Sequence, residues 1–360
     1  MPRHLVSLLS ENSIPNLLLI KTLSGIDRYL FIRPRRLNGG DILKRLCEIC
    51  EISSPTVLEV DEYNLEAMDE VLGKFLAGRD PRDEFVVNLT GGTRIMALAV
   101  FDAFRKLDSR ILYLPPGVNS AKQLWPEHRE AEIAITHRLD MDEYLRAFGV
   151  EAEIVDPRLH SYEQAEKMFR LVSKNSDRDF MHRVNKLGSK KGSRRDRKQQ
   201  GKTIHLFSSV LGIDEREVLR PEWLNYIKGI WFEEYVTHWI NRVLGDGTAR
   251  HGVQVLKDGV VNEVDAAFVY ENRLFFLELK ASAQTSGIND YLYKLDSVGK
   301  DFGLQPICHL VIADHDVEQG LRHSGHFKYR AAKMGIGILT YSQLTPENIE
   351  TSIRKMVRLD

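Results

Sequence analysis

The sequence contains only three cysteines, which are too few for a framework of disulfides. A chain that relies on no disulfides is typical of a reducing compartment, so we expect a cytoplasmic protein. Cys47 and Cys50 form one Cys-x-x-Cys pair within the helical pattern DILKRLCEICEI, and no second pair or nearby histidine completes a zinc site. Two half-buried helix cysteines are therefore the better interpretation.

Long apolar stretches are missing as well, and none approaches the length of a membrane span. The start, MPRHLVSLLSEN, has too short an apolar core for a signal peptide and predicts a first strand. We therefore expect no membrane partner. With 43% hydrophobic and 28% charged residues, the composition is that of a globular protein, and 360 residues suggest two or three domains.

The net charge of −1 gives no general reason to expect nucleic acid as a partner, but the charge is unevenly distributed. From Arg183 to Lys202 the sequence RVNKLGSKKGSRRDRKQQGK contains a single acidic residue. Such a run is usually a solvated loop, and it also suits contacts with a phosphate backbone. We favour a flexible basic loop that helps to hold nucleic acid.

The order of strands and helices predicts two α/β domains. The runs HLVSLLS, DRYLFIR, PTVLEVD, DEFVVNLT and SRILYLP are apolar and strand-like, with helical runs between them. This alternation implies a parallel, doubly wound sheet in residues 1–150. Residues 151–220 are helical and basic, as a linker or small module. Residues 221–360 begin with the amphipathic helix PEWLNYIKGIWFEEYVTHWINRVL and continue as a second α/β domain.

A glycine pair ends the fourth predicted strand, in the motif NLTGGTRIM. Gly91 and Gly92 allow a sharp turn and a close approach to a ligand, and Thr93 is a reasonable N-cap for the helix that follows. The N-terminus of a helix after a parallel strand suits an anion. A purely structural turn is the alternative, because the spacing is neither a Walker A motif nor Gly-x-Gly-x-x-Gly. Further donors in this loop and in the polar loop after the first strand come from Ser10, Asn12, Asn88, Thr90 and Arg94.

Outside its turn, the hairpin NEVDAAFVYENRLFFLELKAS carries three carboxylates, Glu263, Asp265 and Glu278, and one lysine, Lys280. If the loop has an even number of residues centred on Glu271 and Asn272, Asp265 lies opposite Glu278, and Glu263 lies opposite Lys280 on the same face. Like charges directly opposite each other destabilise a sheet, and a divalent cation would remove that repulsion. Two carboxylates, a metal and a lysine are the parts needed to hydrolyse a phosphodiester. A salt-bridged sheet edge is the alternative interpretation.

Both motifs resemble known domains. The strand and helix alternation with NLTGGTRIMALA resembles a CARF domain, the cyclic-oligoadenylate sensor of type III CRISPR systems, and SENSIPNL matches its first-strand loop. The C-terminal part, with Asp265 and Glu-Leu-Lys at 278–280, is similar to a PD-(D/E)xK restriction-endonuclease-like nuclease, although no proline precedes Asp265. The resemblance implies a Rossmann-like sensor and a nuclease, and it does not extend to the helical, basic segment between them.

The resemblance also implies roles for individual residues. Asp265 and Glu278 match the metal-binding positions, and Lys280 matches the catalytic lysine. Many such nucleases take a further glutamate from the preceding helix, and Glu233 borders its apolar face whereas Glu234 points to the polar side. We favour Glu233 as a third ligand for Mg²⁺ or Mn²⁺, with Glu234 as the alternative. Lys294 on the next helix is a surface residue or a phosphate contact. The sensor residues implied are Ser10, Asn12, Asn88, Thr90, Gly91, Gly92, Thr93 and Arg94.

The resulting hypothesis is a homodimeric, metal-dependent endonuclease that cyclic tetra-adenylate activates to cut DNA or RNA. One alternative is a non-enzymatic regulator in which the sensor drives a nucleic-acid-binding domain. That alternative predicts no ordered acidic cluster near Lys280. A second alternative is a ring nuclease that degrades its own activator in the sensor domain. Ser10, Thr90 and Thr93 are available there, but the sequence offers no evident general base.

Overall fold

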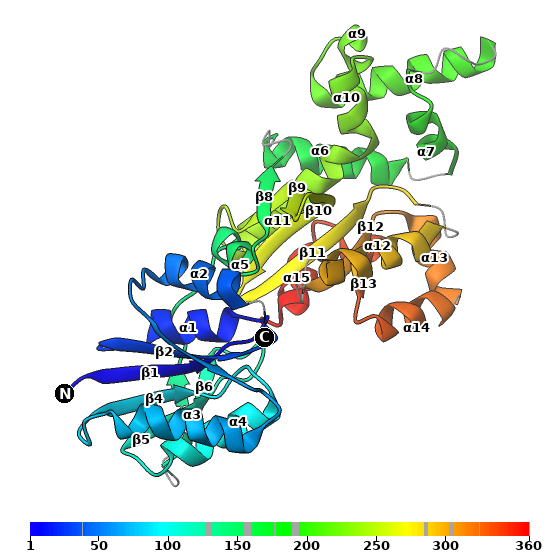
Figure 1. The fold of residues 1–360 in the computed structure, drawn as a ribbon. Coiled ribbons are helices and arrows are strands. Elements are labelled where there is room, and N and C mark those ends of the chain that lie inside the picture. The colour runs from blue at the N-terminus through cyan, green and yellow to red at the C-terminus, as the bar shows by residue number, and fades with distance from the viewer. Residues whose placement is uncertain are drawn as a thin grey trace. The chain divides into compact units, whose positions relative to one another are not determined.

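The structure is a computed structural model that describes residues 1–37, 39–126, 132–154, 160–175, 178–188, 194–283, 287–301, 306–323 and 325–359 (Figure 1). The chain forms two compact units. The first unit contains Met1–Glu151 together with Glu271–Arg273, and the second contains Ala152–Tyr270 and Leu274–Asp360. Each unit is built on its own mixed sheet with helices packed against it, so the predicted α/β class is confirmed.

The sheet of the first unit has the order β3-β2-β1-β4-β5-β6-β7. The first five of these strands are parallel, and β6 and β7 extend the sheet with antiparallel pairing. Parallel pairing of Ser7 with Asn88 brings the ends of β1 and β4 together. The strands are β1 (Arg3–Leu8), β2 (Arg28–Pro34), β3 (Thr56–Val60), β4 (Glu84–Asn88), β5 (Ser109–Tyr113), β6 (Ser120–Trp125) and β7 (Glu132–Ala134).

Helices cover both faces of this sheet (Figure 1). Helices α1 and α2 pack with α5, whereas α3 packs with α4 on the other face. The strand order reverses direction between β1 and β4, and ligands of open α/β sheets bind at such a point. The helices are α1 (Ile14–Thr22), α2 (Gly39–Cys50), α3 (Leu65–Ala77), α4 (Arg94–Phe104) and α5 (Met141–Ala147).

A short turn from the C-terminal half of the chain completes the first unit. Glu271 and Asn272 both have positive φ, 49° and 60°, and form the two-residue loop between β10 (Val260–Tyr270) and β11 (Arg273–Lys280). Asn272 Oδ1 accepts the Leu139 N–H at 2.8 Å, and its amide group donates to Asn119 Oδ1 at 2.7 Å. The loop predicted from the sequence is confirmed.

The sheet of the second unit has the order β13-β12-β11-β10-β9-β8. Strands β9 and β10 are antiparallel, whereas β12 is parallel to both β11 and β13. The remaining strands are β8 (Glu151–Ile154), β9 (Ala249–Lys257), β12 (Ile307–Ile312) and β13 (Gly337–Thr340). Our reading of the region after residue 150 as helical missed β8, which is short, polar and at the sheet edge.

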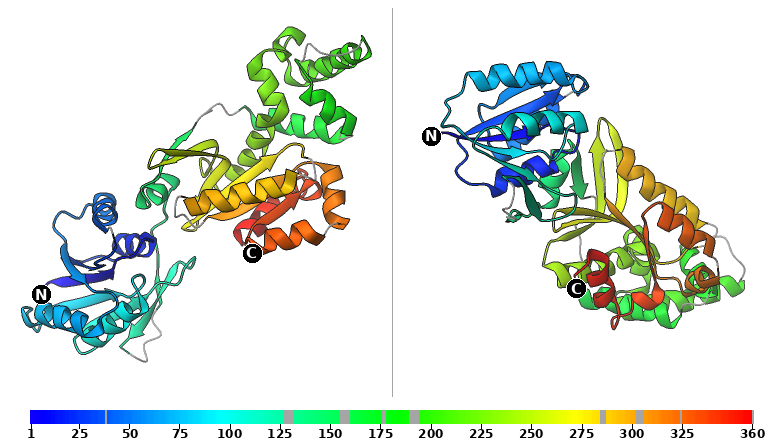
Figure 2. Two further views of the ribbon diagram at one scale, coloured as in Figure 1. Left: turned by 45° about the vertical axis from the view of Figure 1, so that its right-hand side comes forward. Right: turned by 90° about the horizontal axis from the view of Figure 1, so that it is seen from below.

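Helix α11 (Trp231–Leu244) lies in the core of the second unit and packs against α6, α15, β9 and β10. It follows α10 (Pro221–Asn225) through one π-helical turn, Tyr226–Ile230. Figure 2 shows the sheet of the second unit, with helices packed along it, in two further views. The other helices are α6 (Tyr162–Lys174), α7 (Arg178–Asn185), α8 (Arg194–Leu211), α9 (Glu215–Val218), α12 (Ile288–Asp301), α13 (His315–His323), α14 (Gly325–Lys333) and α15 (Ile349–Val357).

The basic segment between residues 183 and 202 differs from the flexible loop that we predicted. Its first residues end α7, and its last nine begin α8, so the described part is mainly helical. Residues 189–193 lie outside the described residues. The prediction failed because Phe180, Val184 and Phe207 are buried in the core of this unit, and their packing orders the helices around the basic residues.

In the part of the chain that is described, each helix is too short or too polar to cross a membrane.

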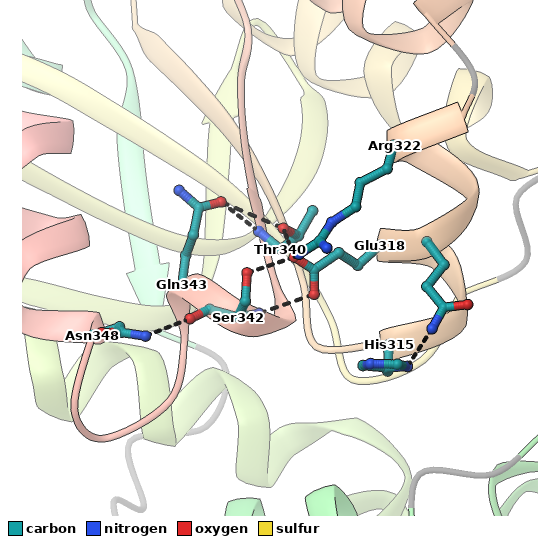
Figure 3. A network of polar contacts seen from close by, with 8 residues as sticks. His315, Glu318, Arg322, Thr340, Ser342, Gln343 and Asn348 are labelled. Carbon is teal, nitrogen blue, oxygen red and sulfur yellow. Dashed lines mark hydrogen bonds and ion pairs between the residues drawn. The ribbon is translucent and has the colours of Figure 1, made fainter.

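A polar network ties α13 to the end of β13 (Figure 3). Glu318 is 5% exposed and accepts hydrogen bonds from the hydroxyls of Ser342 and Thr340 and from Arg322. Burial raises the pKa of Glu318, but these hydrogen bonds outweigh it and hold the pKa below its usual value. A carboxylate with all these partners stabilises the fold rather than reacting.

His309 on β12 gives the fold a measurable acid sensitivity. Burial lowers its pKa from 6.5 to about 4, and Nδ1 has no hydrogen-bond partner among the described residues. Below pH 6.5 the unfolded chain therefore binds a proton that the folded chain does not, so stability is full above pH 6.5 and is lost toward pH 4. We expect His309→Leu to remove this loss, which is about 2 kcal/mol by pH 5.

Urea unfolding at pH 7.5 and pH 5 measures this difference. The free energy of unfolding should fall more for the wild type than for the variant. Parallel pH profiles for the two proteins would contradict the assignment of His309 as an imidazole that stays neutral in the folded protein.

Candidate active site and sensor loop

The loop between β4 and α4 has the geometry that its glycines predicted. Gly91 has φ +116° and Gly92 has φ +62°, a region that only glycine adopts readily. A Cβ atom on Gly91 would lie 2.9 Å from the Leu8 carbonyl oxygen and 3.2 Å from Ser10 Oγ. The loops after β1 and β4 therefore touch, which places Ser10 and the two glycines together at the predicted end of the sheet.

Asn88 and Thr90 lie behind this loop rather than on its surface. Asn88 is fully buried, donates to Asn16 Oδ1 at 2.7 Å and accepts the Thr90 N–H at 2.9 Å. Thr90 is 8% exposed, and its hydroxyl accepts the Leu114 N–H at 2.7 Å. These bonds use the polar groups that we had assigned to a ligand, so both residues shape the loop. Ligand contact by either residue stays a prediction.

The remaining predicted sensor residues are more accessible. Ser10 and Asn12 are half-buried, and the Ser10 hydroxyl donates to the Asn12 carbonyl at 3.0 Å. Arg94 is exposed in the first turn of α4. An exposed guanidinium at a helix N-terminus beside a glycine loop suits a phosphate.

Thr93 links the loop to its helix through two hydrogen bonds. Its hydroxyl accepts the Met96 N–H at 3.2 Å, as an N-cap, and donates to the Glu62 carbonyl at 3.0 Å. We expect Thr93→Ala to lower the free energy of unfolding by about 1–2 kcal/mol, whereas Thr93→Ser keeps the hydroxyl and should stay near the wild type. Denaturant unfolding of both variants measures the effect, and equal losses in the two would argue against the cap.

The hairpin carboxylates and their lysine meet in the second unit as the sequence predicted. Lys280 Nζ lies 2.8 Å from Asp265 Oδ2 and 2.7 Å from Glu278 Oε1. Asp265 Oδ2 also accepts the Leu279 N–H at 2.7 Å. Asp265 and Glu278 are 7% and 2% exposed. Burial lowers the pKa of Lys280, but the two carboxylates outweigh it and hold that pKa above its usual value.

Lys294, which we expected to be a surface residue or a phosphate contact, also contacts this cluster. Its Nζ lies 2.7 Å from Glu278 Oε2 and 3.9 Å from Asp265 Oδ1. The side chain extends from α12 and is 40% exposed. The sequence carried a weak signal for this position, because Lys294 stands on the helix that follows the strand of Glu278 and Lys280.

The two glutamates of α11 have different surroundings. Burial raises the pKa of Glu233 to about 8, with a further contribution from the negative charge of Asp265, so Glu233 is near enough to the carboxylate cluster to feel its charge. Glu234 is fully buried and its Oε1 lies 2.8 Å from His160 Nδ1. The prediction that Glu234 points to the polar side was wrong, because α6 packs on α11 and the His160 side chain contacts Glu234 there. Glu233 remains our candidate for the helix ligand.

The carboxylates do not form a ready-made metal cage. Among the described residues, no group of three or more His, Cys, Asp or Glu side chains is placed to hold a metal ion. The oxygens of Asp265 and Glu278 instead face the ammonium groups of Lys280 and Lys294. The repulsion that we expected a metal to remove is therefore offset by two lysines. The donor chemistry still suits a hard divalent cation, because Asp265 and Glu278 are buried carboxylates that already share one cation, the Lys280 ammonium group.

Comparison with known proteins identifies both halves of the chain. A model of the Card1 CARF domain matches residues 4–144, and a model of the Card1-like endonuclease domain matches residues 221–338. The chain therefore combines a Card1 CARF domain with a Card1-like endonuclease domain. This confirms the resemblance that the two motifs indicated. The glycine loop lies in the CARF domain, and the cluster around Lys280 lies in the endonuclease domain.

Two solved structures share the fold along nearly the whole chain. Can2 from Sulfobacillus thermosulfidooxidans, solved in complex with cyclic tetra-adenylate, is 22% identical with a TM-score of 0.73, and the match covers 98% of this chain and 96% of that one. Protein VC1899 from Vibrio cholerae is 20% identical with a TM-score of 0.73, covering 99% and 98%. A search of curated proteins found no match.

Proposed function

We propose that this protein is a metal-dependent endonuclease of type III CRISPR defence that a cyclic oligoadenylate, of which cyclic tetra-adenylate is the favoured form, switches on. The observation that carries the proposal is the contact of Lys280 with both Asp265 and Glu278 inside a Card1-like endonuclease domain. A regulator without catalysis predicts no ordered acidic cluster at Lys280. The cluster therefore favours an enzyme over that alternative.

The activator site is the loop of Gly91, Gly92 and Thr93 with the neighbouring loop of Ser10. The CARF match and the strand order support this location, and the complex of Can2 with cyclic tetra-adenylate supports the choice of ligand. A ring-shaped ligand with two-fold symmetry suits two copies of the loop across a two-fold axis, so we include a homodimer in the proposal. Leu98 on α4 and Leu65 on α3 are 67% and 49% exposed, and such apolar side chains are available for a partner copy.

Asp265, Glu278 and Glu233 would hold Mg²⁺ or Mn²⁺, because their carboxylate oxygens are the donors that these ions prefer. When bound, the ion supplies a Lewis acid for the phosphate and lowers the pKa of a bound water. Two carboxylates hold Lys280 and raise its pKa. The ammonium group therefore stays protonated and can donate to a phosphate oxygen as negative charge develops there. Asp265 is oriented for its role by the Leu279 N–H.

The decisive experiment incubates the purified protein with labelled DNA or RNA, with and without Mg²⁺ or Mn²⁺, and with and without cyclic tetra-adenylate. We expect cleavage only when metal and activator are both present. Binding of nucleic acid without cleavage under every condition supports the regulator, and loss of intact activator alone supports a ring nuclease.

The switch itself predicts reciprocal binding. The turn between β10 and β11 belongs to the first unit. The two strands, which carry Asp265, Glu278 and Lys280, belong to the second unit, so one hairpin contributes residues to both units. If activator favours the nuclease-competent state, substrate and metal must favour activator binding by the same factor. Inactive Glu278→Gln protein at saturating metal and oligonucleotide should bind cyclic tetra-adenylate several-fold more tightly, as typical coupling free energies are about 1–3 kcal/mol.

Calorimetric titration with and without a non-cleavable oligonucleotide measures this coupling. The matched control is an oligonucleotide-free titration at the same metal concentration. Equal affinities in the two titrations would show that the hairpin does not couple the sites.

A further inference from the structure

Lys294 holds the same pair of carboxylates that a catalytic metal would bridge. Each carboxylate has two oxygens, and each ammonium group lies near one oxygen of each carboxylate. Lys280 takes Asp265 Oδ2 and Glu278 Oε1, at 2.8 and 2.7 Å. Lys294 faces the other two, Glu278 Oε2 at 2.7 Å and Asp265 Oδ1 at 3.9 Å. Every carboxylate oxygen of the pair therefore lies near a positive charge.

This arrangement balances the charge of the cluster. Two buried carboxylates face two ammonium groups, so their charges sum to zero. A divalent cation approaching this cluster meets no net attraction, and it is repelled by whichever ammonium group stays beside it. Binding of a metal between Asp265 and Glu278 therefore requires one lysine to leave.

The two lysines differ in how easily they can leave. Lys280 is a strand residue with a side chain 23% exposed, two contacts under 3 Å and a cation–π contact with Tyr291 at 5.2 Å. Lys294 has one close contact and a side chain 40% exposed, on a helix. An ammonium group with this much access to solvent can be hydrated again when it moves, and its flexible stem allows the movement.

We propose that Lys294 is a resident cation that competes with the catalytic metal and must move away before Asp265 and Glu278 can hold Mg²⁺ or Mn²⁺. This inference rests on the proposed metal-dependent function and adds a residue that sets the metal requirement of the site. Lys294 acts through the carboxylates, so it is a positioning residue.

Metal binding to the full-length protein without nucleic acid or activator tests the inference. Electron paramagnetic resonance of free Mn²⁺ measures the affinity for wild type and Lys294→Gln. Removing a unit charge beside the ion should tighten binding about tenfold. Lys300→Gln is the matched control, because it removes the same charge from the same helix, where Lys300 binds Asp296 at 2.6 Å outside the cluster. That variant should bind Mn²⁺ as the wild type does.

Lys294→Arg keeps the charge and should also bind Mn²⁺ as the wild type does, and circular dichroism shows that each variant is folded. The inference is overturned if Lys294→Gln binds Mn²⁺ no more tightly than the wild type and Lys300→Gln. If the wild type binds Mn²⁺ and cleaves but Lys294→Gln has unchanged affinity, the function stands and the competition fails. If none of the proteins binds Mn²⁺ and cleavage needs no metal, the proposed function fails together with the competition.

Discussion

Asp265→Asn and Glu278→Gln should each reduce nucleic-acid cleavage by roughly 10³-fold or more, which is about 4 kcal/mol of transition-state stabilisation. Each change keeps the shape of the side chain and removes the charge that a metal and Lys280 require. Asp265 and Glu278 contact Lys280 at separate positions, so one carboxylate does not compensate for the loss of the other. Single-turnover cleavage of a labelled substrate at saturating activator measures the loss.

The matched control is Glu350→Gln on α15, which removes the same charge from an exposed side chain paired with Arg354. It should cleave as the wild type does. Activator binding by Asp265→Asn and Glu278→Gln should be unchanged in the absence of metal, because the sensor loop belongs to the other unit. Cleavage at the wild-type rate by either folded variant would remove that residue from the active site.

Gly92→Val should abolish binding of the activator. The backbone of Gly92 has φ +62°, and its Cβ would lie 3.2 Å from Met96 Cε and 3.3 Å from Leu8 Cβ. A β-branched side chain there strains the loop and fills the space next to the surface at which a phosphate would approach. We expect the affinity for cyclic tetra-adenylate to fall at least about 100-fold, or about 2.7 kcal/mol.

The control for this loss is Gly73→Val on α3, where an added Cβ meets no atom within 4 Å. Calorimetry with cyclic tetra-adenylate and thermal unfolding should be run on both variants. Gly91 is a poorer choice for the test, because its Cβ would lie 2.9 Å from a backbone carbonyl that cannot move aside. A folded Gly92→Val protein that binds the activator as tightly as the wild type would falsify the loop assignment.

Local sequence determined the elements whose geometry depends on near neighbours. The apolar strands of the first domain, the glycine turn and the Thr93 cap follow from conformational preferences within a few residues. The hairpin also belongs to this class. A two-residue loop at Glu271 and Asn272 and the alternation of side chains were enough to predict that Asp265, Glu278 and Lys280 meet.

Tertiary packing decided the features that depend on residues far apart in the chain. The π-helical turn and the helices beside α11 bury Glu234 against His160, although its position in the sequence suggested the polar side. Asn88 and Thr90 have the right chemistry for a ligand, yet their bonds to Asn16 and Leu114 place them behind the loop.

Lys294 shows the limit of sequence reasoning most directly. It is 16 residues from Glu278, and only the packing of α12 against the sheet, where α12 contacts β12, brings its ammonium group to the carboxylates. A long side chain on an amphipathic helix can extend to solvent or to a buried site at nearly equal conformational cost. Which of these it does depends on the charge on the neighbouring element, and that charge is known only when the strands and the helix are placed together.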